Sequence, residues 1–446
     1  MARLDSTSRG SERGRPAAGT AGGREGVHVG RAVGATTAAY IEAGTGAFWG
    51  ASLALFSAAF STFALLYCIQ PLLPVLARVF RVSPTVSSLS LSIPSAGIGI
   101  GIVLASSVSE VTGRKTIMFW SLAVSSVLTL VAAVAPTWTL FLSARALTGL
   151  ALSGLPAVAM AYVSEEFHPK ASGLAMGLYI GGTGLGGMTG RLVAGFLTDA
   201  FSWRAAVGVI GAIGLLSCVL FWLFLPASRH FVAHEPAVSK LVETGARHLK
   251  DPGLLRLYCV GFLIMGANVS LFNYIGFRLV EPPYRLSQSA VGLVFLVYLL
   301  GVASSPWSGA MAGRRSSSEV LLLTLTILLG GVVVSLAQPL WIVIAAFGAI
   351  SFGFFGAHTV ASAWIGRRAR EGKALASSLY LFFYYAGASV LGTATGKAWT
   401  EIGWIGVAAS IAAAIVVALI VSWSLRGLPG VEQAVEPDLA HSDEFF

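Results

Sequence analysis

Long runs of apolar residues constrain the fold of this chain more than any other feature. An α-helix rises about 1.5 Å per residue, so about 20 apolar residues cross the roughly 30 Å hydrocarbon core of a bilayer. Twelve segments of this kind lie at residues 49–69, 86–108, 116–134, 138–162, 171–196, 204–225, 254–279, 288–309, 319–336, 340–364, 374–397 and 404–425. They predict an all-α polytopic membrane protein with twelve transmembrane helices.

The composition excludes an ordinary soluble domain. Hydrophobic residues make up 55% of the chain and charged residues only 11%, whereas about 25% of the residues in a typical soluble domain are charged. The three cysteines, Cys68, Cys218 and Cys259, all lie in apolar segments. The sequence therefore indicates neither a disulfide framework nor a metal site, and we expect no cofactor.

One motif is shared with nucleotide-binding enzymes. The stretch GGTGLGG (181–187) contains the G-x-G-x-x-G pattern, which in a dinucleotide-binding turn follows a β-strand. Here the pattern lies inside an apolar segment, and another long apolar segment precedes it. We therefore interpret Gly182, Gly186 and Gly190, which recur every four residues, as a surface for close helix packing in the membrane.

Polar segments divide the chain into five parts. Residues 1–48 are rich in Gly, Ala, Ser, Thr and Arg, which predicts a disordered tail, although a start codon assigned too early would also explain them. Two six-helix bundles are expected at 49–225 and 254–425, with a polar linker at 226–253 between them. Residues 426–446 form a second tail.

The two expected bundles repeat one another in sequence. Gly113-Arg114-Lys115 matches Gly313-Arg314-Arg315 at an offset of 314 − 114 = 200 residues, and Trp203 matches Trp404 at 404 − 203 = 201. Repeats of this kind are typical of transporters built from duplicated helical units. The sequence predicts two copies of one six-helix unit in the same topology.

The basic residues predict the orientation in the membrane, because Lys and Arg accumulate in short cytoplasmic loops. With the N-terminus inside, 21 of the 29 Lys and Arg residues fall on the cytoplasmic side and 6 on the opposite side. Both termini are therefore predicted to be cytoplasmic. The net charge of +9 is explained by this topology, so no nucleic-acid partner is expected.

This orientation can be tested with inserted tags. We expect tags at residues 30 and 240 to be accessible only from the cytoplasm, and a tag at residue 285 only from outside, because the basic loops stay inside. Antibody access in intact and permeabilised cells measures this. An externally accessible tag at residue 240 would contradict the assignment of twelve helices.

Several motifs resemble the major facilitator superfamily. SSVSEVTGRK (106–115) is similar to the loop between the second and third helices of that family, and RALTGLALSG (145–154) to its arginine pattern in the fourth helix. GLYIGGTGLGGMTGRL and SLYLFFYYAGAS resemble the YnfM-like inner-membrane transport proteins, a branch placed among small-molecule exporters. The resemblance covers about residues 49–425 and implies transport by alternating access, with substrate held between the two halves.

The chain departs from two patterns of the family. The glycine-rich motif in the fifth helix of exporters includes a proline, which is absent beside Gly186 here. The loop between the second and third helices has Ser106, Glu110 and Val111 where the family has Gly and Asp-Arg. The resemblance still implies a gating loop that locks a helix end on the cytoplasmic side, although its basic residues could serve only as topology anchors. The residues implied are Glu110, Gly113, Arg114 and Lys115.

Few ionisable residues are expected at depth in the membrane. None of the 20 Asp and Glu residues lies in the central two-thirds of an expected span, so no carboxylate proton relay is predicted. Arg145, Arg191 and His358 remain. Arg145 matches the arginine of the family motif, Arg191 could instead extend to the membrane surface, and His358 could carry a coupled proton or be a satisfied core residue.

The two arginines have no buried acid beside them in the sequence. Their partners could be backbone carbonyls, water, Asp199 or a substrate that brings a negative charge or a hydrogen-bond acceptor. The other candidate substrate-binding residues are aromatic and amide side chains that could orient a ligand in an apolar cleft. They are Tyr67, Gln70, Asn268, Asn273, Tyr274, Tyr384 and Tyr385.

These features predict a secondary active transporter that moves a small molecule across the bacterial cytoplasmic membrane by proton-coupled efflux, and no enzymatic activity. A proton-coupled importer of a small metabolite is the alternative. Other classes are a non-transporting membrane sensor and a membrane-embedded enzyme, for which SEEFHPK (164–170) offers the one acidic cluster at a membrane surface. The expected partners are the lipid bilayer, a small-molecule substrate and protons, and a monomer is expected.

Overall fold

The computed structural model describes residues 40–231 and 238–427, including all side chains there except those of 106–112, 157 and 238–241. Nearly all of this part of the chain is α-helical, and an isolated β-bridge pairs Ile41 with Phe167. The predicted all-α fold class is therefore confirmed. The gating residue Glu110 lies outside the described side chains.

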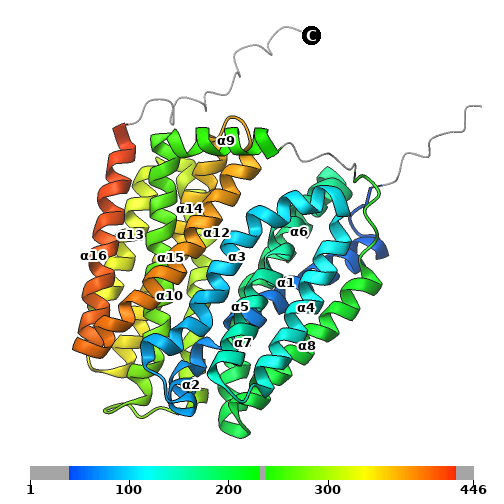
Figure 1. Cartoon of the computed structure of the whole chain (residues 1–446). Coiled ribbons are helices and arrows are strands. Elements are labelled where there is room, and N and C mark those ends of the chain that lie inside the picture. Colours follow the sequence, from blue (N-terminus) through cyan, green and yellow to red (C-terminus); the bar gives the residue numbers. More distant parts are fainter. Residues whose placement is uncertain (1–39, 232–237, 428–446) are drawn as a thin grey trace, which may run out of the picture. The chain divides into compact units, whose positions relative to one another are not determined.

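The first six expected spans form eight α-helices and one 3-10 turn (Figure 1). Two of the spans are interrupted: the first near Cys68, and the fourth at Ser153. The elements are α1 (Gly46–Tyr67), η1 (Gln70–Leu72), α2 (Leu73–Phe80), α3 (Pro84–Thr112), α4 (Arg114–Val134), α5 (Trp138–Leu152), α6 (Gly154–Glu166), α7 (Pro169–Ala200) and α8 (Trp203–Phe224).

The linker contains a helix, and the remaining spans follow it. The elements are α9 (Val238–Lys250), α10 (Pro252–Val280), α11 (Gln288–Val294), η2 (Phe295–Val297), α12 (Tyr298–Arg314), α13 (Ser317–Val334), α14 (Leu340–Arg368), α15 (Lys373–Ile402), α16 (Trp404–Trp423) and η3 (Ser424–Gly427). Below, α1–α8 are termed the N-terminal half and α10–α16 the C-terminal half.

Local sequence explains where several of these helices begin. Ser83 and Ser287 are extended, and their hydroxyl groups accept hydrogen bonds from the backbone N–H groups of Val86 and Ala290. Such caps satisfy N–H groups that have no partner inside the helix. Gly113 separates α3 from α4 with φ of 89°, a backbone conformation that favours glycine.

Eleven helical segments in the described residues are long and apolar enough to cross a membrane. The remaining expected span, the fifth (171–196), corresponds to α7, which is not among the eleven. Nine of its 32 residues are glycine, which has nearly neutral hydropathy and dilutes the apolar character of the helix. The length of α7 and its extensive packing against α1 and α8 place it among the other spans.

The glycines of α7 bring its backbone against α1. A Cβ atom at Gly182 would lie 2.6 Å from the carbonyl oxygen of Phe56, and one at Gly190 would lie 2.7 Å from Cα of Ala64. A Cβ at Gly186, between them, would overlap the backbone of Phe60. The three glycines thus form a continuous contact surface, as small residues do where membrane helices approach closely.

The C-terminal half repeats this close approach. A Cβ at Gly387 in α15 would overlap the backbone of Phe262 in α10. Gly387 follows Gly186 by 387 − 186 = 201 residues, and Phe262 follows Phe60 by 262 − 60 = 202. The repeat in the sequence therefore corresponds to a repeat in helix packing.

The linker helix α9 is fastened to the C-terminal half. The Asp251 carboxylate, at the start of α10, accepts hydrogen bonds from the Arg368 side chain at 2.6 and 3.1 Å and from the backbone N–H of Leu254. Burial alone would raise the pKa of Asp251, but these hydrogen bonds and the guanidinium charge lower it from its ordinary value. A second ion pair joins Arg247 of α9 to Glu371.

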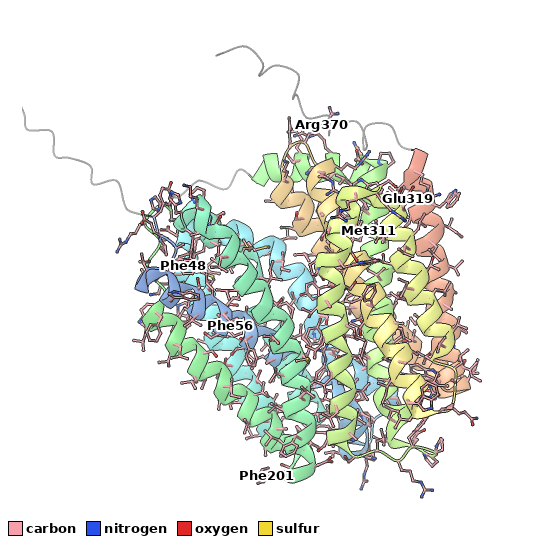
Figure 2. The ribbon with its side chains drawn as sticks, turned by 180° about the vertical axis from the view of Figure 1, so that it is seen from behind. Phe48, Phe56, Phe201, Met311, Glu319 and Arg370 are labelled. Carbon is pink, nitrogen blue, oxygen red and sulfur yellow. The ribbon has the colours of Figure 1, made fainter. Side chains whose placement is uncertain are left out.

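The two halves meet through a few helix pairs. α3 packs against α15, α7 against α11, and α2 and η1 against α10, and Figure 1 shows α3 beside α15. Figure 2 shows Arg370 and Glu319 at one end of the helices and Phe201 at the other. The end with Arg370, where α9 also lies (Figure 1), is the one that the basic residues predict to be cytoplasmic.

Candidate functional site

A buried arginine lies where the two halves meet. Arg191 of α7 is 2% exposed, and its Nε donates a hydrogen bond to Oε1 of Gln70 at 2.7 Å. Its guanidinium lies 4.1 Å from the ring centre of Tyr67 in its own half. It lies 4.8 and 5.0 Å from the ring centres of Tyr298 and Phe295 in the other half. We term these five residues the Arg191 centre.

A chain of side-chain hydrogen bonds runs from this arginine into the C-terminal half. Nε2 of Gln70 donates to Oδ1 of Asn273 at 2.8 Å. Because arginine only donates hydrogen bonds, Gln70 must present its oxygen to Arg191 and its nitrogen to Asn273. Asn273 therefore presents its oxygen to Gln70, and its buried Nδ2 has no hydrogen-bond partner among the described residues.

The charge of Arg191 is not neutralised by an acid. Its other hydrogen bond in the described structure goes from Nη1 to the carbonyl oxygen of Gly187 at 2.7 Å, and no ion pair to a described residue involves it. Burying an ion costs several kcal/mol, while each aromatic face returns about 0.5–2 kcal/mol. The neutral contacts offset this cost, but none of them supplies a negative charge.

Further polar and aromatic side chains surround the centre. Nδ2 of Asn268 donates to the hydroxyl group of Tyr298 at 3.1 Å, and its buried Oδ1 accepts no hydrogen bond from the part of the chain that the structure describes. The rings of Tyr384 and Tyr385 pack edge to face with their centres 5.4 Å apart. Both tyrosines lie within electrostatic range of Tyr67. Of the seven substrate-binding candidates, these six lie together: Tyr67, Gln70, Asn268, Asn273, Tyr384 and Tyr385.

Tyr274 is the seventh candidate and lies apart from the others. It is fully buried, its hydroxyl group donates to the carbonyl oxygen of Gly392 at 3.2 Å, and its ring stacks with that of Trp399. Asn273 and Tyr274 are adjacent in the chain, so they point to different faces of α10. This accounts for the separation.

His358 lies in an aromatic cluster of the C-terminal half. Its Nδ1 is 2.8 Å from the hydroxyl oxygen of Tyr380, and its ring stacks between those of Phe354 and Tyr380. The ring of Tyr384 lies 4.7 Å away. Tyr384 thus connects the His358 cluster to the surroundings of Arg191.

Arg145 has a different environment. It is fully buried, and its guanidinium donates to the carbonyl oxygens of Leu65, Leu66 and Ser90 at 2.9, 2.8 and 3.2 Å. Leu65 and Leu66 are in the last turn of α1, where carbonyl groups lack helical partners and carry partial negative charge. Backbone carbonyls, one of the partners considered from the sequence, therefore hold this arginine inside the N-terminal half.

The gating-loop residues contact the N-terminal half. Arg114 forms an ion pair with Glu165 at 2.8 Å. Nζ of Lys115 donates to the carbonyl oxygens of Trp222 and Leu225 at the end of α8, at 2.9 and 2.6 Å. These contacts tie α4 to α6 and α8. A lock between this loop and the other half stays a prediction.

A seam that the sequence analysis missed joins α7 to α11. Arg191, Gly195 and Asp199 follow one another at intervals of four residues and face the same segment of the other half. The Asp199 carboxylate accepts hydrogen bonds from the backbone N–H groups of Gln288 and Ser289 at 3.1 and 2.7 Å. Asp199 is thus a helix cap and does not pair with Arg191.

Gly195 forms the middle of this seam. A Cβ atom there would lie 2.5 Å from the carbonyl oxygen of Gln288 and 3.2 Å from Cα of Gly292. The two helix backbones therefore touch. The spacing R-x-x-x-G-x-x-x-D in the sequence (191–199) is the signal that could have identified one face of α7 as a contact surface.

Comparisons with known proteins point to one family. The family model described as Major Facilitator Superfamily matches residues 55–281. The chain is 46% identical over 387 residues to the inner membrane transport protein YnfM of Escherichia coli, covering 87% of this chain and 93% of YnfM. It is 43% identical over 380 residues to the MFS-type transporter YybF of Bacillus subtilis, covering 85% of this chain and 94% of YybF.

Solved structures share the fold. The nucleoside transporter NupG superposes with a TM-score of 0.67 at 14% identity, over 84% of this chain and 99% of NupG. The peptide transporter POT gives a TM-score of 0.69 at 13% identity, over 84% of this chain and 94% of POT. Such low identity supports the fold alone. From the family match and the long, closely similar relatives, this chain is an integral membrane protein that belongs to the major facilitator superfamily of transporters.

Proposed function

We propose that this protein is a secondary active transporter that exports a small molecule across the bacterial cytoplasmic membrane by alternating access, in exchange for protons. The Arg191 centre carries this proposal. It is buried, polar and built from both halves of the protein, and it contains a charged group with which no described acidic residue forms an ion pair. A site of this kind between two halves is where an alternating-access transporter binds its substrate.

The two halves, 49–225 and 254–425, are proposed to move as the two bodies of the transport cycle, connected by the linker 226–253. The seam between α7 and α11 lies at the end of the helices that the charge distribution predicts to be external. In this conformation, the seam would separate the Arg191 centre from the outside. Its opening is proposed to be the step that exposes the centre to the external side.

The location and orientation are part of the same proposal. The printed name of the relative YnfM, an inner membrane transport protein, and the distribution of Lys and Arg support the bacterial inner membrane with both termini in the cytoplasm. The protein is proposed to act as a monomer, because the Arg191 centre takes all its members from one chain.

Substrate exchange by reconstituted protein tests this function. Proteoliposomes loaded with a compound library should exchange at least one labelled compound faster than liposomes that lack the protein. Liposomes with an unrelated membrane protein control for leakage. If no compound exchanges above both controls, although the protein is correctly folded and inserted, the transport proposal is wrong.

His358 is proposed to carry the coupled proton. Histidine changes its charge near neutral pH, and the residue lies beside Tyr384 near the proposed substrate site. Replacing His358 by glutamine, which keeps a hydrogen-bonding group for Tyr380 but cannot titrate, should abolish transport driven by a pH gradient. Exchange without a gradient should continue at a similar rate.

A matched variant separates the titrating group from its hydrogen bond. Tyr380→Phe removes the hydroxyl partner of His358 but keeps the histidine, so pH-driven transport should remain. Both variants are measured in the same vesicles, with external pH varied at constant internal pH. Unaltered pH dependence in His358→Gln would rule out this coupling role.

A further inference from the structure

We propose that the substrate of this transporter is an organic anion, with a carboxylate or similar oxyanion on an aromatic body, and that Arg191 binds the anionic group. This inference rests on the proposed transport function and adds the chemical class of the substrate. It comes from the balance of charge and of hydrogen-bond donors and acceptors at the Arg191 centre, and from the side chains around it.

The first step of the argument concerns charge. Arg191 stays cationic at any ordinary pH, and its contacts with described residues are a neutral amide, a backbone carbonyl and three aromatic rings. Ionised groups buried in a membrane protein are expensive unless they are paired. A ligand that enters with a negative charge is therefore favoured, and a ligand that enters with a positive charge is disfavoured.

The second step concerns hydrogen-bond donors. Nε and Nη1 of Arg191 have protein partners, whereas Nη2 forms no hydrogen bond to a described residue. The chain of hydrogen bonds through Gln70 ends at Nδ2 of Asn273, another donor that has no partner in the described structure. A planar oxyanion accepts hydrogen bonds and matches the fork of a guanidinium group.

The third step excludes the other deep arginine. Arg145 is fully buried inside the N-terminal half, and its guanidinium donates hydrogen bonds to three carbonyl oxygens there. None of these three hydrogen bonds involves a residue of the C-terminal half. Arg191, by contrast, touches rings from both halves, so an anion bound to it would also contact both halves.

The fourth step concerns the body of the substrate. Aromatic rings dominate the surroundings of Arg191: Tyr67, Tyr298 and Phe295 contact it, and Tyr384 and Tyr385 lie within electrostatic range of Tyr67. Aromatic rings pack well against other rings, both stacked and edge to face. An aromatic body would therefore gain contacts here that a small hydrophilic anion could not make.

Binding to the purified full-length protein in lipid nanodiscs tests the inference. Three probes are compared: benzoate, benzylamine, which has a similar size but is cationic, and lactate, which is anionic but lacks a ring. We expect saturable benzoate binding, at least about tenfold weaker lactate binding, and no benzylamine binding, since a tenfold ratio requires only one aromatic contact of about 1.4 kcal/mol. Tighter binding of benzylamine, or no saturable binding of benzoate, would overturn the proposal.

Variants then identify the residue. Arg191→Gln should weaken benzoate binding by at least about 30-fold, as expected when one partner of a buried charge pair is removed. Arg191→Lys should retain part of the affinity, because it keeps the charge but not the fork. The matched control Lys397→Gln removes an exposed charge at the external end (side chain 81% exposed) and should bind benzoate like the parent protein.

Three further outcomes are distinguishable, and the last two separate this inference from the proposed function. If Arg191→Gln fails to fold, the preference of the parent protein for benzoate over benzylamine still decides the charge of the ligand. If vesicle exchange identifies a cationic substrate, transport stands and the anion proposal falls. If benzoate binds through Arg191 but no anion exchanges in vesicles, the binding site stands and the transport proposal falls.

Discussion

Replacing Gly186 by valine is expected to prevent α7 from packing on α1 and to leave little folded protein. The new Cβ would overlap the carbonyl group of Phe60, which belongs to a helix backbone and cannot turn away as a side chain can. Overpacking in a close-packed core typically costs about 1–3 kcal/mol. We expect a clash with the backbone of a neighbouring helix to cost at least as much as the upper end of that range. The yield of monodisperse protein in detergent and its thermal unfolding temperature measure the effect.

The same helix provides the control. A Cβ at Gly181 meets no atom within 4 Å, so Gly181→Val changes the same residue type one position away without a clash. This variant should be as stable as the parent protein. In the C-terminal half, Gly387→Val should destabilise the fold as Gly186→Val does, and Gly330→Val, also in open space, should not. Equal stability of Gly186→Val and Gly181→Val would contradict the packing argument.

Replacing Gly195 by valine is expected to favour the conformation that is open to the outside. The added side chain would push against the backbone at Gln288 and Gly292 in α11, and these contacts exist only while the seam between the halves is closed. A penalty of about 1–3 kcal/mol on the closed state shifts the ratio of the two states by about 5- to 150-fold. Unlike Gly186→Val, this substitution should leave the fold intact, because the two halves can separate.

Thiol labelling measures this shift. The three native cysteines are replaced by alanine, a single cysteine is introduced at Asn268 near the Arg191 centre, and a membrane-impermeant reagent is added outside. Labelling should be faster in Gly195→Val than in the parent and unchanged in Gly181→Val. Asp199→Asn should act in the same direction but less strongly, since losing a helix cap costs about 0.5–2 kcal/mol. If labelling in Gly195→Val equals that of the parent, the seam is not the external gate.

Much of the architecture followed from the sequence. The apolar segments predicted the helices, and the family motifs predicted the superfamily, because both depend on local composition and on short patterns of residues. α7 shows the limit of hydropathy, since its nine glycines reduce its apolar character while they enable its packing. The sequence also identified Arg145, Arg191 and His358 as the ionisable groups at depth.

The partners of these groups depended on the tertiary structure. The sequence did not reveal that carbonyl groups within one half hold Arg145, or that Arg191 touches both halves. Gln70 and Asn273 are 203 positions apart, and Asp199 and Gln288 are 89 apart. The physical reason is that lipid tails are as apolar as most helix side chains. The hydrophobic pattern of a membrane helix therefore reveals that it spans the bilayer but not which face meets protein, and only the packed helices decide which distant residues meet.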